Sequence, residues 1–469
     1  MKNRIKKGQP RMVTIRNKEQ LAQNGQTRID RRARMLALNC LESAVNSVDP
    51  KRIIESRVQL RNSTLKVDQY SFDLRKFKHV YVVGGGKASG SMATALEQIL
   101  GKHITCGLVN VPKKDVHKTK IIQLHAASHP IPDESGVEGT RRMLEIAEGA
   151  EEDDMVICLI SGGGSSLMPL PRGNISIADK RTLTDALLKS GATINEINTV
   201  RKHISDFKGG WLAKKAYPAT IVNLILSDVV GDPLDFIASG PTVPDSTTFG
   251  DAIRVLEKYR FWNEAPRAIR KVLTDGEKGI IPETPKAGDD AFKKAHNIII
   301  GNNRSASLTA CESLKTAGLN TLLLTATLEG EAKQVGTILA TIAREVCASE
   351  NPVPKPAGII AGGETTVIVT GKGLGGRNQE IPLAASTRLN GLDGTVIASL
   401  TTDGVDGPTD AAGAIADGKT LARAAELGMR PEQFLAENDS YHFFEKLEDL
   451  MFTGPTGTNV NDISVIIVL

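Results

Sequence analysis

Short apolar runs alternate with amphipathic segments along most of this chain. From Lys78 onward, apolar runs of strand length predict buried strands, and apolar residues at every third or fourth position predict helices. The first series of expected strands is 80–83, 104–109, 121–124, 155–160 and 221–226. The expected helices are 30–48, 89–100, 136–148, 177–189 and 194–205. This alternation predicts an α/β fold with a parallel, doubly wound sheet that helices cover on both faces.

Two of the expected strands end in glycine-rich turns. Residues 80–83 lead into Gly84, Gly85, Gly86 and Lys87, and residues 155–160 lead into Ser161, Gly162, Gly163, Gly164, Ser165 and Ser166. Backbone N–H groups that no side chain covers bind phosphate or carboxylate, so we expect both turns to bind an anion. Neither turn matches a P-loop, and Gly84, Gly86 and Gly90 give G-x-G-x-x-x-G rather than the dinucleotide pattern G-x-G-x-x-G.

A second α/β series follows residues 274–290, a segment rich in Gly, Pro and charge that is the expected linker. The expected strands of this series are 296–300, 320–325, 358–361, 365–369 and 395–401, and a last apolar run covers 463–468. A length of 469 residues is typical of two or three domains.

Composition narrows the class of protein. A net charge of +4 and an aromatic content of 4% argue against a nucleic-acid partner. No apolar stretch has the length of a membrane span, and no signal-peptide pattern is present. The five cysteines are scattered without zinc-site spacing, which indicates reduced thiols and a cytoplasmic location.

Basic residues are concentrated at the N-terminus. Seven of them precede the first acidic residue, Glu19: Lys2, Arg4, Lys6, Lys7, Arg11, Arg16 and Lys18. We expect residues 1–29 to form a solvated, disordered leader, with Met12 as an alternative start of translation. A targeting arm or an RNA-binding arm is the other interpretation.

Several residues at the expected strand ends are candidates for chemistry. Lys87 follows three glycines and can hold a moving phosphate, although it could also be a solvated surface lysine. Asp228 follows residues 221–226 and is a candidate for a general base, for a Mg²⁺ ligand or for the cap of the next turn. His129 lies in the turn His-Pro-Ile-Pro-Asp, where a structural role is the ordinary interpretation.

Further candidates come from two other segments. Arg201 and Lys208 lie near an expected helix end and are candidate substrate contacts, unless they only complement the helix dipole. Gly376 and Arg377 open an expected helix, and arginine recognises carboxylate or phosphate through two hydrogen bonds. Asp403 follows the strand 395–401 and is a second candidate ligand for Mg²⁺.

Seven motifs in this order resemble one family. They are Gly-Gly-Gly-Lys-Ala-Ser, His-Pro-Ile-Pro-Asp, Ser-Gly-Gly-Gly-Ser-Ser, Val-Arg-Lys-His-Ile-Ser, Leu-Ser-Asp-Val, Gly-Gly-Arg-Asn-Gln-Glu and Thr-Thr-Asp-Gly-Val-Asp-Gly. The chain resembles the glycerate 2-kinases of the MOFRL type over residues 30–469. The resemblance implies a large Rossmann-like domain at 30–285, which 440–469 could rejoin, and a smaller MOFRL-type α/β domain at 286–439. It also implies an active site in the cleft between them.

The resemblance further implies a reaction. ATP, with Mg²⁺, would phosphorylate the 2-hydroxyl of D-glycerate and give 2-phosphoglycerate and ADP. The family's active-site lysine and arginine fall on Lys87 and Arg377. We assign the loop 161–166 to the nucleotide, and Asp228 either activates the hydroxyl or holds Mg²⁺.

Two other functions compete with this interpretation. Some relatives carry the label hydroxypyruvate reductase, and an NAD(P)H-dependent reductase should show a complete dinucleotide fingerprint. A non-catalytic protein that binds sugar acids is the third possibility. In each case we expect small-molecule partners, no nucleic acid, no membrane, and a monomer or homodimer.

Overall fold

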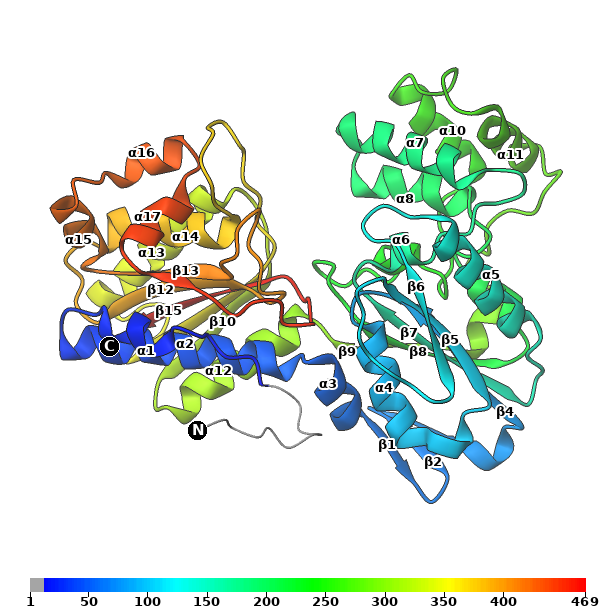
Figure 1. Cartoon of the computed structure of the whole chain (residues 1–469), viewed down its shortest axis with the longest axis horizontal. Helices are drawn as coiled ribbons and strands as arrows, with labels where there is room; N and C mark the ends of the chain where they lie inside the picture. The colour runs from blue at the N-terminus through cyan, green and yellow to red at the C-terminus, as the bar shows by residue number, and fades with distance from the viewer. Residues whose placement is uncertain (1–11) are drawn as a thin grey trace. The chain divides into compact units, whose positions relative to one another are not determined.

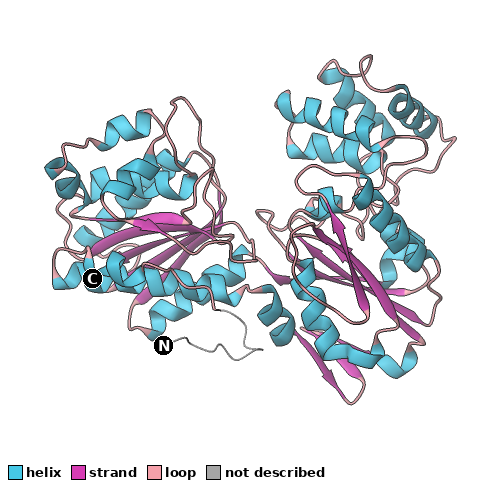
Figure 2. Ribbon diagram, viewed as in Figure 1, coloured by secondary structure: helices cyan, strands magenta, loops and turns pink. Residues whose placement is uncertain are grey.

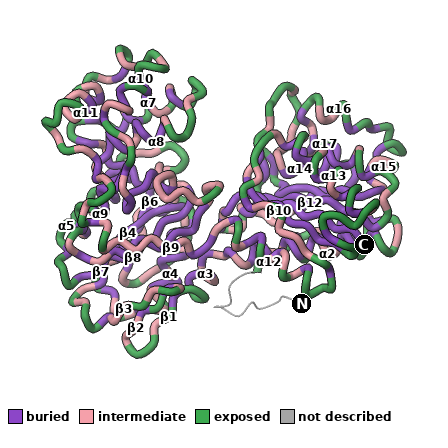
Figure 3. Tube along the Cα trace, turned by 180° about the vertical axis from the view of Figure 1, so that it is seen from behind, coloured by how far each residue is buried: buried purple, intermediate pink, exposed green. Residues whose placement is uncertain are grey.

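The structure is a computed structural model that describes residues 12–469. The chain forms two compact units. Unit 1 comprises Met1–Asp49 and Gly301–Leu469, and unit 2 comprises Pro50–Ile300. Each unit has its own sheet, flanked by helices, with the buried residues gathered on its strands (Figures 2 and 3).

Unit 2 is built on a sheet with the strand order β6-β5-β4-β7-β8-β9 (Figure 1). The strands are β4 (His79–Gly85), β5 (Cys106–Pro112), β6 (Ile122–Ala127), β7 (Asp154–Ser161), β8 (Thr220–Leu226) and β9 (Ala295–Gly301). Neighbours from β6 to β8 pair in parallel. Numbered within the sheet, the order is 3-2-1-4-5-6, so the winding reverses between β4 and β7. The doubly wound sheet expected from the sequence is confirmed.

Helices cover both faces of this sheet (Figure 1). The helix α4 (Ser89–Leu100) packs on one face, with α3 (Pro50–Arg57) beside it, and α5 (Glu134–Glu148) and α9 (Trp211–Ala216) pack on the other. The strand β7 is buried along its whole length, because it lies at the centre of the sheet. A small antiparallel sheet precedes β4 and consists of β1 (Val58–Arg61), β2 (Thr64–Val67) and β3 (Tyr70–Asp73).

A group of helices extends unit 2 beyond the sheet and has a hydrophobic core of its own. It consists of α7 (Ile177–Lys189), α8 (Ile194–His203), α10 (Phe249–Lys258) and α11 (Arg267–Glu277), and the short α6 (Gly164–Leu167) lies between β7 and this group. Helices α7 and α8 begin with capping boxes, Ser176 with Asp179 and Thr193 with Glu196. These caps are sequence-local, which is why both helix starts match the expected ones.

Unit 1 contains a mixed sheet with the order β10-β11-β15-β12-β13-β14. The strands are β10 (Asn320–Leu328), β11 (Ala357–Gly363), β12 (Thr395–Thr401), β13 (Gly413–Asp417), β14 (Leu450–Met451) and β15 (Asp462–Val468). Only β10 and β11 pair in parallel; the other pairs are antiparallel. Helices α2 (Arg28–Ser47) and α12 (Asn303–Thr316) lie on one face, and α13 (Ala332–Ser349) and α14 (Arg377–Leu389) on the other (Figure 1).

Shorter helices complete unit 1: α1 (Lys18–Gln23), α15 (Thr420–Glu426), α16 (Pro431–Ala436) and α17 (Ser440–Lys446). Within residues 12–469, no helix is both long and apolar enough to cross a bilayer.

The unit boundaries differ from those expected from the sequence. Helix α2 packs in unit 1, and β15 pairs with β11 and β12 there, so residues 440–469 do not rejoin the first sheet. The expected strand 296–300 closes the first sheet as β9. Residues 365–369 form no strand, because only Thr366 makes an isolated bridge there. Sheet membership depends on long-range pairing, which the local pattern does not encode.

The expectation of a disordered leader is wrong for residues 12–29. Ile15 and Leu21 are buried, the Arg16 amide donates to the Phe452 carbonyl at 2.7 Å, and Lys18 pairs with Glu42 at 2.7 Å. Burial of Ile15 and Leu21 therefore orders this segment despite its high density of charge. The basic residues from Lys2 to Arg11 lie outside the described residues.

A buried ion-pair cluster ties α2 to the sheet of unit 1. The guanidinium of Arg34 donates to Asp417 at 2.6 Å and to Asp449 at 2.7 Å, and all three side chains are fully buried. A second cation, Arg423, donates to Asp449 at 2.7 Å. Because these carboxylates are shielded from water, their charge depends on the arginines.

Replacing Arg34 should therefore destabilise the protein strongly. We expect Arg34→Met to lower the free energy of unfolding by about 3–5 kcal/mol, because it leaves buried carboxylates without their main partner. The control is Lys419→Met, which breaks a partly exposed pair with Asp393 and should cost less than about 1 kcal/mol. Urea unfolding of both variants tests this, and equal losses would contradict it.

Candidate active site

The two glycine-rich turns meet at the point where the winding of the unit 2 sheet reverses. They follow β4 and β7, which are neighbours in the sheet with Gly85 opposite Ile160. The Lys87 amide donates to the Gly162 carbonyl at 2.8 Å, and the Ala88 amide donates to Ser161 Oγ at 3.0 Å. Ligands of open α/β sheets bind at this position.

Glycine is required in the second turn for two reasons. A Cβ atom on Gly162 would lie 2.1 Å from Asp228 Oδ2, so this carboxylate lies directly against the turn. Gly163 has φ +80°, and a Cβ there would lie 2.8 Å from the His129 ring and 3.2 Å from Lys87 Cγ. Lys87, His129 and Asp228 thus surround the same turn, although they come from distant parts of the chain.

The environment of His129 favours its neutral form. Partial burial and the nearby charge of Lys87 lower the pKa of His129 below its usual value. A neutral imidazole can accept a proton at pH 7. The structure therefore places a potential base beside Lys87, in addition to Asp228.

A cavity of about 800 Å³ opens beside the second turn, entirely within unit 2. Ser165 and Ser166 form part of its lining, together with Lys180, Arg201 and Lys208. The sequence had indicated all of these residues except Lys180. Size and lining are typical of a site for a small molecule.

A fourth cation of the lining, Arg181, is exposed, whereas Lys180, Arg201 and Lys208 are buried or partly buried and poorly compensated. Burial lowers the pKa of Lys180 to about 7 and that of Lys208 well below its usual value, and mutual repulsion with Arg201 adds to both shifts. Burial also lowers the pKa of Arg201. Lys208 Nζ donates only to the Ala238 carbonyl, at 3.3 Å, and no described residue accepts a hydrogen bond from Lys180 Nζ.

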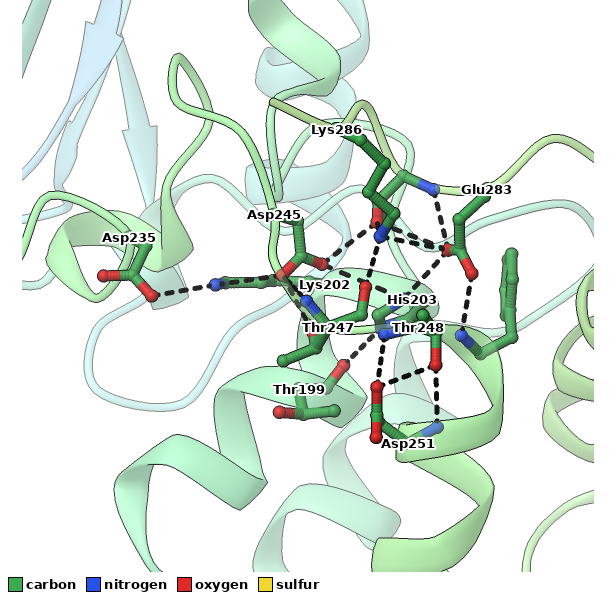
Figure 4. Close-up of polar contacts among 12 residues, drawn as sticks. Thr199, Lys202, His203, Asp235, Asp245, Thr247, Thr248, Asp251, Glu283 and Lys286 are labelled. Atoms are coloured by element: carbon green, nitrogen blue, oxygen red, sulfur yellow. Dashed lines mark hydrogen bonds and ion pairs between the residues drawn. The ribbon is translucent and has the colours of Figure 1, made fainter. Parts of the chain in front are cut away.

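A polar network anchors helix α8, which also carries Arg201 (Figure 4). Lys202 lies 3.4 Å from both Asp235 and Asp245. His203 Nδ1 lies 2.7 Å from the Thr199 carbonyl, and Nε2 lies 3.0 Å from Glu283. Since a carbonyl only accepts, Nδ1 is the donor in the contact with Thr199. This network uses the other basic residues of the motif and leaves Arg201 to the cavity.

In unit 1, Arg377 begins α14 and is bound by carboxylates of its own unit. Its Nε and Nη2 donate to both oxygens of Asp462, at 2.5 and 3.1 Å, and Nη1 lies 3.1 Å from Glu364. A guanidinium has five N–H donors, so some remain for a ligand. These two N–H groups, which we expected to bind a substrate, bind Asp462 instead.

Gly376 has a packing role beside this arginine. A Cβ on Gly376 would lie 2.4 Å from Asp406 Cγ, and Asp406 accepts hydrogen bonds from the amides of Asn378 and Gln379, at 3.2 and 3.1 Å. Burial and the neighbouring Asp462 raise the pKa of Asp406 to about 7. The structure thus explains this glycine without a ligand.

The candidate Mg²⁺ ligands lie in different units, Asp228 in unit 2 and Asp403 in unit 1. Asp403 accepts from Thr401 Oγ1 and from the Val405 amide, both at 3.1 Å, and so shapes its own turn. Across residues 12–469, no three His, Cys, Asp or Glu side chains are grouped to hold a metal ion. The metal ligands therefore stay a prediction.

Comparison with known proteins identifies the family. Residues 36–274 match a domain of unknown function (DUF4147), and residues 357–462 match the MOFRL family. The chain is 43% identical to a glycerate 2-kinase of Pyrococcus horikoshii over 93% of this chain and 97% of the relative. It is 42% identical to a D-glycerate 2-kinase of Thermotoga maritima, over 92% and 97% of the two chains. The chain belongs to the MOFRL-type glycerate kinase family.

Solved structures of this family share the fold. A crystal structure from Pyrococcus horikoshii matches with a TM-score of 0.85 and 42% identity, over 93% of this chain and 98% of the other. A glycerate kinase structure from Thermotoga maritima matches with a TM-score of 0.83 and 41% identity, over 92% and 99%. A relative from Agrobacterium vitis, 40% identical over 93% of this chain and 94% of its own length, is called a putative hydroxypyruvate reductase. The resemblance seen in the motifs is thereby confirmed.

Lys180 is the residue of this site that sequence reasoning missed. It lies on the buried face of α7 with Ile177, Leu183 and Leu187, at the positions where an amphipathic helix is apolar. A lysine on the apolar face of a helix was the available signal.

We expect Lys180 to destabilise the folded kinase. We expect Lys180→Met to raise the free energy of unfolding at pH 7 by about 2–4 kcal/mol, because it removes a buried charge that has no hydrogen bond to lose. In the folded protein the Lys180 ammonium has a pKa of about 7, whereas in the unfolded chain its pKa is 10.5. The unfolded state then binds more protons, so wild-type stability rises with pH in this window and the advantage of the variant shrinks.

The matched control is Lys189→Met, on the same helix but exposed. It should change stability by less than about 0.5 kcal/mol at any pH in this range. Thermal and urea unfolding from pH 7 to 10 measure the difference, and a loss of stability in Lys180→Met would show that the lysine is structural.

Proposed function

We propose that this protein transfers the γ-phosphoryl group of ATP to the 2-hydroxyl of D-glycerate, giving 2-phosphoglycerate and ADP. The observation that carries the proposal is the turn 161–166, which lies at the switch point of the sheet, borders a cationic cavity and has Lys87 beside it. The names of the similar proteins from Pyrococcus and Thermotoga support the same reaction.

The chemistry of phosphoryl transfer fits these residues. The reaction needs positioned anions and cations on the transferring group, and little covalent chemistry from the protein. Lys87 is an exposed ammonium at the edge of the turn, which suits contact with the phosphoryl group in the transition state. We assign Ser161, Gly162 and Gly163 to the phosphates through their backbone N–H groups.

Two groups can take the proton of the glycerate hydroxyl. Asp228 lies against Gly162, and the neutral ring of His129 lies against Gly163. Asp228 is also the candidate ligand for Mg²⁺, because this ion usually binds one or two carboxylates together with substrate phosphates rather than a full protein cage. A carboxylate beside the turn fits that donor set, and the ion would neutralise charge that develops on the phosphates.

Arg377 is proposed to act in the same reaction from unit 1. The pairs with Asp462 and Glu364 hold the guanidinium rigidly, and its remaining donors are free for a phosphate or for the carboxylate of glycerate.

The proposed compartment is the cytoplasm, since all five cysteines are free thiols. A monomer or homodimer stays the prediction for the oligomeric state.

The reductase is the second candidate, because two relatives in Agrobacterium vitis carry that name. The six-stranded order is also that of dinucleotide-binding folds. The turn after β4, however, lacks the G-x-G-x-x-G spacing.

A direct assay separates the two reactions. The purified protein should consume ATP only with D-glycerate or a close 2-hydroxy acid and a divalent metal, and the product should be 2- rather than 3-phosphoglycerate. It should not oxidise NADH or NADPH with hydroxypyruvate. Coupled ADP release and NMR of the product measure this, and reductase turnover without ATP consumption would overturn the assignment.

Lys87→Ala should lower kcat by at least about 10²-fold, because it removes a contact made in the transition state. The side chain is exposed, so the unfolding midpoint should not change. Lys102→Ala, just beyond the other end of α4, is the control and should keep wild-type kinetics. A near-wild-type kcat for Lys87→Ala would make the lysine a solvated surface residue.

Arg377→Lys should be nearly as harmful as Arg377→Ala. A lysine keeps the charge but loses the two parallel bonds to the buried Asp462, and we expect a loss of about 2–4 kcal/mol in kcat/KM. The control is Arg388→Lys at the exposed end of the same helix. Steady-state kinetics with ATP and D-glycerate varied separately test this, and wild-type activity in Arg377→Lys would show that charge alone matters.

A further inference from the structure

The cavity beside the second turn has an unusual electrostatic character. Lys180 and Lys208 are buried, with 5% and 1% exposure, and Arg201 is partly buried beside them. All three line the same cavity of about 800 Å³. Arg201 lowers the pKa of Lys180, and both lower the pKa of Lys208, in keeping with their place in one cavity.

No carboxylate in the described structure neutralises this group directly. The nearest acid acting on Lys180 is Asp206, and its carboxylate is bonded to Arg172 at 2.8 Å. The one acid among the described residues that line the cavity, Asp185, is exposed and paired with Lys189 at 2.7 Å. Buried charges are normally paired with an opposite charge. The described residues supply none to this group, so a bound anion would complete it.

We propose that this cavity binds the triphosphate of ATP, with Lys180, Arg201 and Lys208 in direct contact with it. The proposal rests on the kinase function proposed above. Three converging cations match a multiply charged anion better than the single carboxylate of glycerate. Ser165 and Ser166, at the end of the glycine turn, line the same cavity and extend the phosphate site toward Lys87.

The cavity lining also includes apolar side chains, which suit a nucleoside. Pro130, Ile131, Pro169 and Leu188 line the cavity, and Ile131 and Leu188 are 58% and 55% exposed. Exposed apolar side chains and buried cations in one cavity favour a ligand with one charged and one flat, apolar end. A three-carbon acid would use neither the apolar side chains nor most of the volume.

The serine pair also joins this cavity to the rest of the site. Ser165 Oγ lies 3.1 Å from Ser239 Oγ, which donates to Asn198 on α8 at 3.1 Å. This chain of hydroxyls fixes the turn relative to the helix that carries Arg201. The cations therefore face a rigid phosphate-binding turn, so that little ordering is needed on binding.

Direct binding measurements test the assignment. The variants are Lys180→Met, Arg201→Gln and Lys208→Met, and the control is Lys189→Met on the exposed face of α7. Isothermal titration with ATP, and with inorganic tripolyphosphate as a probe without a nucleoside, should show Kd values raised about ten- to hundredfold for each cavity variant, the usual worth of a hydrogen bond to a charged group. The KM for D-glycerate at saturating ATP should stay within about twofold of wild type.

Stability separates a binding role from a structural one. If Lys180 stabilised the fold, its replacement would lower the melting temperature. We expect instead that Lys180→Met binds ATP more weakly and melts at a higher temperature than wild type. Circular dichroism of each variant before titration shows that it is folded. Weaker binding together with lower stability in all three variants would overturn the assignment.

The remaining outcomes are also decisive. If D-glycerate loses affinity and ATP does not, the cavity is the acid's site. If all three variants keep wild-type Kd values while wild type phosphorylates glycerate, the triphosphate assignment fails and the kinase function stands. If wild type neither binds ATP nor turns it over, both fail together.

Discussion

The close approach of β4 and β7 at the switch point is the constraint on which the site of unit 2 depends. The amide of Lys87 donates to the Gly162 carbonyl, and this bond brings the two glycine turns together. At Gly162 and Gly163 any side chain would collide with Asp228 or with the His129 ring. Glycine at these positions therefore lets a carboxylate, an imidazole and an ammonium reach one backbone turn.

The cations of the cavity in unit 2 differ from the paired arginines of unit 1. In unit 1 the buried Arg34 is bonded to Asp417 and Asp449, and the partly buried Arg377 to Asp462 and Glu364. In unit 2, Lys180 and Lys208 are buried without any carboxylate bonded to them. Paired charges hold a fold together, whereas unpaired ones cost stability and persist where a ligand compensates them. This contrast is the physical basis for placing an anion in unit 2.

The polar network behind α8 shows how such a cluster is maintained. Lys202 and His203 bind Asp245 and Glu283 (Figure 4), while Arg201 lines the cavity. Three consecutive basic residues thus serve two purposes, because successive positions of a helix point in different directions. The network holds the backbone that carries Arg201, and the ligand is left to compensate its charge.

The sequence by itself determined the features that are local. Apolar periodicity predicted β4, β7 and the helices α4 and α7, since strand and helix periods are encoded over a few residues and capped by neighbours such as Ser176 and Asp179. The glycine turns and the ordered motifs predicted an anion site and the family. Only the tertiary structure decided that Lys180 joins Arg201 and Lys208, that β15 completes the sheet of unit 1, and that the fork of Arg377 is bonded to Asp462. These outcomes depend on contacts between residues far apart in the chain, and the free energy of such contacts is set by packing and burial rather than by local pattern.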